Sequence, residues 1–186
     1  MLIGLTGRIA AGKESLTEFL RKKGFVYFET SKLLKEELQK RGVEITRENM
    51  QNLGDELRKK EGAGVLMEIF IGRMESGKNY IIDSIRNTGE IEFLRKNARD
   101  FILIGIDAPQ KIRFERIIKR GKPSDPKTWE EFLKADNRDF FDKTNPLGQQ
   151  VEKCMELADY KIMNDGEFES SLEKIKKIWA ELKEKC

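Results

Sequence analysis

The residues best suited to chemistry form a glycine-rich loop near the N-terminus. Gly7, Gly12 and Lys13 match the spacing G-x-x-x-x-G-K of loops that bind nucleotide phosphates. Glycines there let backbone N–H groups surround phosphate oxygens, and the lysine places an ammonium on the outer phosphates. We therefore expect the whole loop to contact phosphates, through Gly7, Arg8, Ile9, Ala10, Ala11, Gly12, Lys13, Glu14 and Ser15.

A carboxylate and an arginine follow a short apolar run at 80–82. Asp83 would stand at the end of a buried strand, where it can hold Mg²⁺ directly or through a water molecule. Arg86, three residues later, can bind a phosphate with both arms of its guanidinium. The alternative interpretation is that Asp83 only caps a helix that begins near Asn87.

A basic segment lies at 111–122, where six basic residues face a single acid, Glu115. Its arginines at 113, 116 and 120 have the spacing of one helix face. Lysine-rich runs usually form a solvated surface, but arginines in this position can neutralise charge on a phosphoryl group in transfer. We assign this role to Arg116 and Arg120, together with Arg138 further along the chain.

Two further segments are candidates for ligand contacts. Between 30 and 78, four polar or basic residues could bind a second anionic ligand, and these are Ser31, Lys35, Arg47 and Arg58. A turn at Asn164, Asp165 and Gly166 follows the last apolar run. In a sheet whose first loop binds phosphates, this last loop is expected near the base of a nucleotide.

These residues need a scaffold, and the hydrophobic pattern predicts one. Short apolar runs bounded by Gly, Asp or Asn are typical of buried parallel strands covered by helices on both faces. The predicted class is therefore α/β, a three-layer fold with a five-stranded parallel sheet. The expected strands are 2–5, 25–28, 80–82, 101–106 and 160–163, and the expected helices are 13–23, 31–41, 46–60, 64–76, 88–97, 109–119, 128–138, 146–157 and 167–184.

Two segments exceed a simple strand–helix alternation. Residues 30–78 form a helical, highly charged insertion, and a turn-rich loop near 121–126 precedes another helix, for which Thr128 and Glu131 form a capping-box pattern. Insertions at the carboxyl ends of parallel strands overhang the ligand crevice and can close over it. We expect one domain over 1–186, with a core at 1–29, 79–119 and 139–186, an acceptor-binding insertion at 30–78 and a lid at 120–138.

Composition excludes several classes of protein. The chain has 186 residues and a net charge of +3, which gives no strong signal for nucleic acid. There is no histidine, so every histidine-based catalytic arrangement is excluded, and two cysteines make no disulfide framework. No run approaches the ~20 apolar residues of a membrane span. We expect a cytoplasmic protein without a membrane partner, and both a monomer and a homodimer remain open.

Taken together, these motifs resemble the P-loop nucleoside monophosphate kinase-like family. The likeness covers nearly the whole chain and is greatest to an archaeal branch described as adenylate kinase-related or dephospho-coenzyme A kinase-like. The segments that carry it are 4–13, 47–58, 82–86, 113–120 and 158–166. The resemblance implies a core sheet, an acceptor-binding insertion and a mobile lid. It also implies that Lys13 serves the donor phosphates, Asp83 the magnesium or the acceptor, and Arg86 the acceptor phosphate.

Two positions depart from the family pattern. Glu14 stands where a hydroxyl residue usually binds Mg²⁺, so that Glu14 itself, Ser15 or a water molecule could hold the metal. Some similar kinases of deoxynucleotides also have an acidic residue there. Lys35 stands where these kinases commonly have an arginine that grips the acceptor, and a lysine offers a point charge rather than a fork.

The resemblance implies an ATP- and Mg²⁺-dependent kinase of a small phosphorylated acceptor, most simply a nucleoside or deoxynucleoside monophosphate. A phosphate acceptor is already ionised, so positioning and charge neutralisation carry the reaction without a general base. Dephospho-coenzyme A is a neighbouring candidate whose hydroxyl would need a carboxylate base, for which Asp83 is available. The alternative from another class is an ATP-binding or ATPase switch that recruits a partner in RNA or ribosome biology.

Overall fold

One parallel sheet organises the chain. The structure is a computed structural model that describes residues 1–141, 145, 147–165 and 168–184. Five strands lie in the order β2-β3-β1-β4-β5, which confirms the predicted fold class. Within the described residues the elements are β1 (Leu2–Thr6), α1 (Lys13–Arg21), β2 (Val26–Glu29), α2 (Thr30–Lys40), α3 (Arg47–Glu61), α4 (Val65–Ile71), β3 (Tyr80–Asp83), α5 (Thr88–Asn97), β4 (Phe101–Asp107), α6 (Gln110–Arg120), α7 (Trp129–Phe140), α8 (Val151–Glu156), β5 (Tyr160–Met163) and α9 (Phe168–Glu184).

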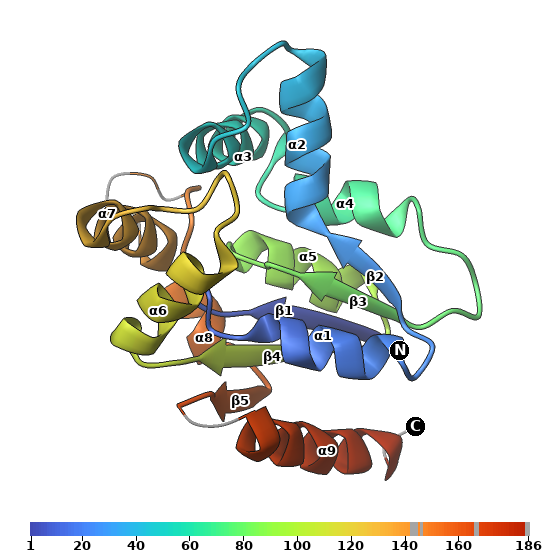
Figure 1. Ribbon diagram of the computed structural model, residues 1–186. Coiled ribbons are helices and arrows are strands. Elements are labelled where there is room, and N and C mark those ends of the chain that lie inside the picture. The colour runs from blue at the N-terminus through green and yellow to red at the C-terminus, as the bar shows by residue number, and fades with distance from the viewer. Residues whose placement is uncertain (142–144, 146, 166–167, 185–186) are drawn as a thin grey trace.

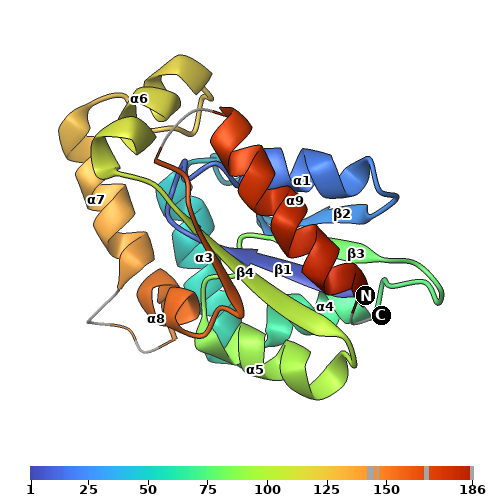
Figure 2. The same ribbon diagram turned by 90° about the horizontal axis from the view of Figure 1, so that it is seen from below.

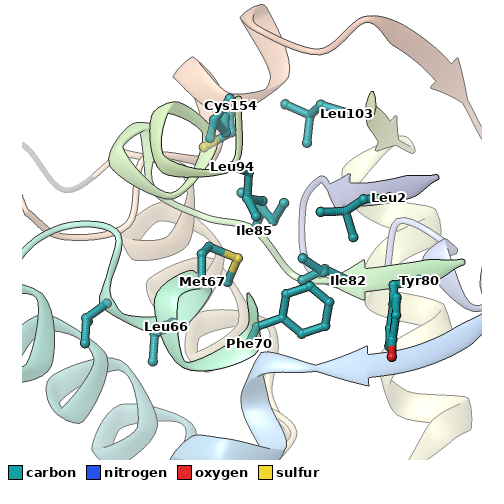
Figure 3. Close-up of a cluster of buried hydrophobic side chains, with 12 residues drawn as sticks. Leu2, Leu66, Met67, Phe70, Tyr80, Ile82, Ile85, Leu94, Leu103 and Cys154 are labelled. Atoms are coloured by element: carbon teal, nitrogen blue, oxygen red, sulfur yellow. The ribbon is translucent and has the colours of Figure 1, made fainter. Parts of the chain in front are cut away.

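Helices cover both faces of the sheet. All five residues of β1 are buried, as the continuous apolar run of a central parallel strand requires. Leu2 and Ile82 face α4, α5 and α8 in one cluster that includes Phe70 (Figure 3). Ile3 and Leu5 face α1 and α9 in the cluster on the other side, and Figure 2 shows these two helices together on that face.

The carboxyl ends of the strands provide the place for a ligand. β1 pairs with β3 on one side and with β4 on the other. The chain runs from β1 to β2 on the first side, and after β3 it crosses to β4 on the second, so the direction of the connections reverses beside β1. Ligands of open α/β sheets bind in the crevice beyond such a switch point. The glycine-rich loop follows β1 there, with the pair α2 and α3 at the top of Figure 1 and the pair α6 and α7 at its left.

Two expected helices are shorter than the pattern predicted. α4 ends at Ile71, ahead of Gly72, rather than at 76, and its residues are part of the core. The helix expected from 146 begins only at Val151, because 147–150 form a loop fixed by tertiary hydrogen bonds. In that loop the Gln150 backbone N–H donates to the carbonyl of Arg86, 2.6 Å away. Helical periodicity could not reveal this competing interaction.

None of the described helices combines the length and the apolar character that crossing a bilayer demands.

Candidate functional site

A cleft of about 580 Å³ opens at the carboxyl ends of the sheet. Its walls come from the glycine-rich loop, the ends of β2 and β3, the insertion, α6 and the loop after α6. Most of the residues that the sequence predicted for phosphates and metal meet here. The predicted residues that line the cleft are Ile9, Ala10, Ala11, Gly12, Lys13, Glu14, Ser15, Ser31, Lys35, Arg47, Asp83, Arg86, Arg116, Arg120 and Asn164.

The glycine-rich loop has a shape that only glycine permits at two points. Gly7 has φ +143°, and a Cβ there would lie 2.0 Å from the carbonyl oxygen of Ile106. Gly12 has φ +97°, and a Cβ there would lie 2.0 Å from the amide nitrogen of Asn164. α1 begins directly afterwards and has no side-chain cap. The free N–H groups of its first turn therefore face the cleft as a site for an anion.

Lys13 lies inside this loop. Its ammonium donates to the backbone carbonyls of Gly7 at 3.2 Å and Arg8 at 3.3 Å. Burial lowers the pKa of Lys13, and the carboxylate of Asp83 opposes the shift. Because the ammonium is poorly solvated, a phosphate in the cleft would supply the counter-charge that it lacks.

Asp83 presents its carboxylate to the cleft at the end of β3. It accepts hydrogen bonds from the hydroxyls of Tyr27 and Ser84, both at 3.2 Å. Burial and the adjacent Asp83 raise the pKa of Tyr27, which keeps that hydroxyl protonated as a donor. The interpretation of Asp83 as a helix cap is wrong, since Asn87 caps α5 and forms a capping box with Glu90.

The cleft could hold a magnesium ion only if phosphate oxygens and water supplied most of its ligands. The described residues contain no group of three or more His, Cys, Asp or Glu side chains suited to a metal. Mg²⁺ typically takes one or two protein carboxylates and completes its shell with phosphate oxygens and water. Asp83 and the hydroxyl of Ser15, which both line the cleft, meet that requirement. The carboxylate of Glu14 lies 3.5 Å from the ammonium of Lys122 and 3.7 Å from the guanidinium of Arg120.

Two of the predicted arginines lie over the glycine-rich loop. Arg116 donates to the carbonyl of Ala11 at 3.3 Å and to the side-chain oxygen of Asn164 at 3.1 Å. Arg120 forms a two-armed pair with Asp125, with distances of 2.8 and 2.7 Å. α6 thereby brings two guanidinium groups to the wall of the cleft next to Lys13.

The opposite wall carries a second group of cations. Arg47 of α3 is paired with Asp139 of α7, and Arg86 lies 3.8 Å from the same carboxylate. Lys35 of α2 lines this wall, and Ser31 donates its hydroxyl proton to Glu29. Two of the three arginines expected to bind an acceptor, Arg47 and Arg86, are thus close together, on α3 and directly after β3.

Two of the arginines predicted for the acceptor or for the group in transfer do not line the cleft. Arg58 is only 3% exposed and binds the carbonyl of Leu147 and the carboxylates of Asp55 and Glu90. Arg138 faces α3 instead, where its guanidinium lies 3.3 Å from Asp55. Arginines and lysines are abundant throughout this chain. Their spacing in the sequence therefore could not distinguish these two structural arginines from the arginines that line the cleft.

The remaining predicted residues lie around the site. Gly7 forms the base of the loop, and Arg8 turns away from the cleft to pair with Asp136 of α7. Asp165 is exposed and lies 3.5 Å from the ammonium of Lys174. Gly166 lies outside the described residues.

Several residues of the cleft were not predicted as part of the site. They are Tyr27, Glu29, Met50, Ser84, Lys119, Lys122, Ser124 and Asp125. Glu29 ends β2 in register with Asp83, so the order of the strands would have revealed it. Lys119 and Lys122 belong to the basic run that the sequence did mark. Asp125 could have been predicted only with knowledge of how the backbone runs in the loop between α6 and α7.

Comparison with known proteins gives one family and a consistent group of relatives. The AAA domain family matches residues 3–141. A UPF0200 protein of Pyrococcus horikoshii is 30% identical over 184 residues, which cover 96% of this chain and 95% of that protein. A UPF0200 protein of Methanocaldococcus jannaschii is 31% identical over 186 residues, which cover 98% of this chain and 90% of that protein.

Solved structures with a similar fold include kinases. A shikimate kinase from Aquifex aeolicus has a TM-score of 0.54 and 16% identity, with 100% of this chain and 98% of that chain covered. A dephospho-CoA kinase from Campylobacter jejuni has a TM-score of 0.52 and 19% identity, with 97% and 96% covered. At these identities the likeness concerns the fold alone, and it confirms the resemblance to P-loop kinase-like proteins.

Proposed function

The chain belongs to the AAA domain family and is related to the UPF0200 proteins, and from this relationship and the geometry of the cleft we propose that it is an ATP- and Mg²⁺-dependent phosphotransferase. Its acceptor is a small phosphorylated molecule, with a nucleoside or deoxynucleoside monophosphate favoured. One observation carries the proposal. The glycine-rich loop with Lys13 lines the same cleft as two neighbouring arginines, Arg47 and Arg86.

The donor half would bind the triphosphate. The N–H groups at the start of α1 and the ammonium of Lys13 bind phosphate oxygens, and Arg116 and Arg120 approach from α6. In phosphoryl transfer, negative charge is spread over the equatorial oxygens of the moving group, so guanidinium groups on that side stabilise the transition state. Arg120 would share or exchange its present partner, Asp125.

The acceptor half would hold the nucleophile. Arg47 and Arg86 bind the phosphate of the acceptor and aim one of its oxygens at the donor. That oxygen is ionised at neutral pH, so the reaction needs no histidine, and the chain contains none. If the acceptor offers a hydroxyl, as in dephospho-coenzyme A, Asp83 would take its proton.

Asp83 and Ser15 are the residues that would hold Mg²⁺. When bound, the ion neutralises charge on the phosphate oxygens. Glu14 faces the cations of the lid instead, which favours Ser15 over Glu14 as the ligand from the loop.

A switch protein is the second candidate, and one contact favours it. Glu14, directly after Lys13, contacts Arg120 and Lys122 around the lid, so a bound nucleotide could alter the position of the lid without any transfer. Such a protein would use the lid as a surface for a partner.

One experiment separates the two candidates. The purified protein is incubated with ATP, Mg²⁺ and a panel of nucleoside monophosphates, dephospho-coenzyme A or no acceptor, and turnover is measured. With the best acceptor, Arg120→Ala should lower kcat by ~10²–10³ with little loss of ATP affinity, because its contact forms mainly in the transition state. Arg99→Ala, an exposed arginine remote from the cleft, is the matched control.

The two negative results have different meanings. A wild type that binds ATP but phosphorylates no acceptor would reject the kinase and leave the switch as the function of the cleft. An Arg120→Ala variant with the kcat of the wild type would reject the role of Arg120 in phosphoryl transfer.

A further inference from the structure

A buried carboxylate of α7 lies between the two arginines of the acceptor wall. Asp139 accepts a hydrogen bond from Arg47 of α3, and its same oxygen, Oδ2, lies 3.8 Å from Nη1 of Arg86. Its other oxygen accepts from the side-chain amide of Gln51 at 2.6 Å. One side chain of α7 therefore joins α3 to the segment after β3.

This carboxylate is ionised within the protein. Asp139 is 2% exposed, and although burial alone would raise its pKa, Arg47 and Arg86 hold that pKa below its usual value. Removing one partner of a buried ion pair of this kind costs much free energy, because the other charge is then left unpaired. Asp139 therefore keeps its place when a ligand enters.

The arginines have donors left over for a ligand. A guanidinium carries five N–H donors, and Asp139 takes only one end of each group. The Nε of Arg47 is buried and has no hydrogen-bond partner among the described residues. Among the described residues, the guanidinium of Arg86 donates one further hydrogen bond, to the side-chain oxygen of Gln149 at 3.5 Å. Both side chains line the cleft, so their remaining donors suit an oxyanion there.

Charge explains why such an arrangement needs Asp139. Two neighbouring guanidinium groups repel each other: burial is the main cause of the lowered pKa of Arg47, and Arg86 lowers that pKa further while Asp139 opposes the shift. A fixed carboxylate between them offsets the repulsion before any ligand arrives. The same helix carries Asp136, which binds Arg8 of the glycine-rich loop, so α7 supports both halves of the cleft.

We propose that Asp139 is a positioning residue that assembles Arg47 and Arg86 into one site for an oxyanion of the acceptor. The proposal rests on the function proposed above and adds the residue that prepares the acceptor site. The oxyanion is a phosphate or a carboxylate, because an arginine can bind either group with two parallel N–H···O hydrogen bonds.

The test is a binding measurement that requires no turnover. The full chain is first saturated with Mg²⁺ and a non-hydrolysable ATP analogue, so that the glycine-rich loop is filled, and is then titrated calorimetrically with inorganic phosphate or with acetate. Asp139→Asn should weaken binding of the preferred anion by about tenfold or more, the equivalent of one charge-assisted hydrogen bond. Glu130→Gln, which removes an exposed charge from the same helix, should bind like the wild type.

Two further variants separate positioning from charge and from folding. Gln51→Leu keeps both arginines and the charge of Asp139 but removes the hydrogen bond to the second carboxylate oxygen of Asp139. A several-fold loss of anion affinity in this variant would therefore show the effect of the position of Asp139, separate from its charge. If Asp139 acts through Arg47, the double variant Asp139→Asn/Arg47→Ala should bind no more weakly than Arg47→Ala. Circular dichroism establishes which variants are folded, and Gln51→Leu decides the question if Asp139→Asn is not.

Each outcome has a clear meaning. Phosphate bound more tightly than acetate supports a phosphate-bearing acceptor, and the reverse order supports the same site with a carboxylate ligand. Unchanged or tighter anion binding in the folded Asp139→Asn and Gln51→Leu variants overturns the proposal, as does a wild type that binds neither anion. Failure of the kinase activity alone would leave these binding results intact, so the two proposals fail separately.

Discussion

Asp136 offers a direct test of how the glycine-rich loop is supported. Its carboxylate is fully buried and accepts hydrogen bonds from Arg113 of α6, at 2.5 and 3.0 Å, and from Arg8 of the loop. Arg113 is itself 1% exposed and also donates to the carbonyl of Ala108. Asp136→Asn would replace this carboxylate with a neutral amide, and the buried guanidinium of Arg113 would keep Asp107, 3.8 Å away, as a more distant charged partner.

The expected cost follows from this burial. Removing one partner of a buried, hydrogen-bonded ion pair typically costs about 3–5 kcal/mol. That is a large share of the roughly 5–15 kcal/mol by which domains are stable. For a chain of this length, each kcal/mol corresponds to about 2–4 °C, so the melting temperature should fall by roughly 6–20 °C.

Urea denaturation of the wild type, Asp136→Asn and the exposed control Glu130→Gln measures the effect. The midpoint of Asp136→Asn should fall with an unchanged m-value, while the control stays within about 0.5 kcal/mol of the wild type. ATP affinity should fall as well, because Arg8 loses its anchor. A loss of stability below about 1 kcal/mol would refute the argument, since it would show that water or another group readily takes the place of the carboxylate.

Three further predictions concern the loop and the acceptor wall. Lys13→Ala should leave the fold intact but reduce turnover by about 100-fold or more, measured by steady-state kinetics and ATP titration, and unchanged ATP affinity would contradict the assignment of the loop. Gly12→Ala should abolish ATP binding, because its Cβ would overlap the amide of Asn164, whereas Gly24→Ala, also at positive φ but with open space around it, should bind ATP normally. The pKa of Asp139 is lower in the folded state than its ordinary value of about 3.9, so the stability that its charge contributes is complete above that value and is lost as the pH falls through the folded-state pKa. The difference in unfolding free energy between wild type and Asp139→Asn should therefore stay constant from pH 7 to about pH 4 and shrink below it.

The fold was predictable because the signals for it are local. The strand at 2–5 is apolar throughout and is followed by glycines at fixed spacing, and all five strand positions agree with the structure to within a residue or so. The position of α8 was not predictable in the same way. Its first expected turn is replaced by a loop whose backbone bonds to Arg86, an interaction between residues distant in sequence.

The candidate site was predictable only in part, for a related reason. Lys13 and Asp83 each have a motif around them, and both line the cleft. Arg58 and Arg138 have the same residue type as the arginines of the cleft, but acidic partners on other elements hold them elsewhere. Asp139 has no motif at all, and only the packing of α7 against α3 reveals what it does.

The two walls of the cleft differ in how their arginines are held, and this difference has a consequence for ligand binding. Arg47 is paired with a buried carboxylate of a packed helix, so an incoming anion must share its guanidinium with Asp139. Arg120 is paired with Asp125, which lies in the loop after α6; the two side chains are 25% and 7% exposed, against 18% and 3% for Arg47 and Asp139. Exchange of the partner of Arg120 is expected to cost less, because water reaches this pair more than the pair of Arg47. We therefore expect the wall with Arg47 and Arg86 to be formed before any ligand binds, and the pair of Arg120 and Asp125 to rearrange more when a ligand enters.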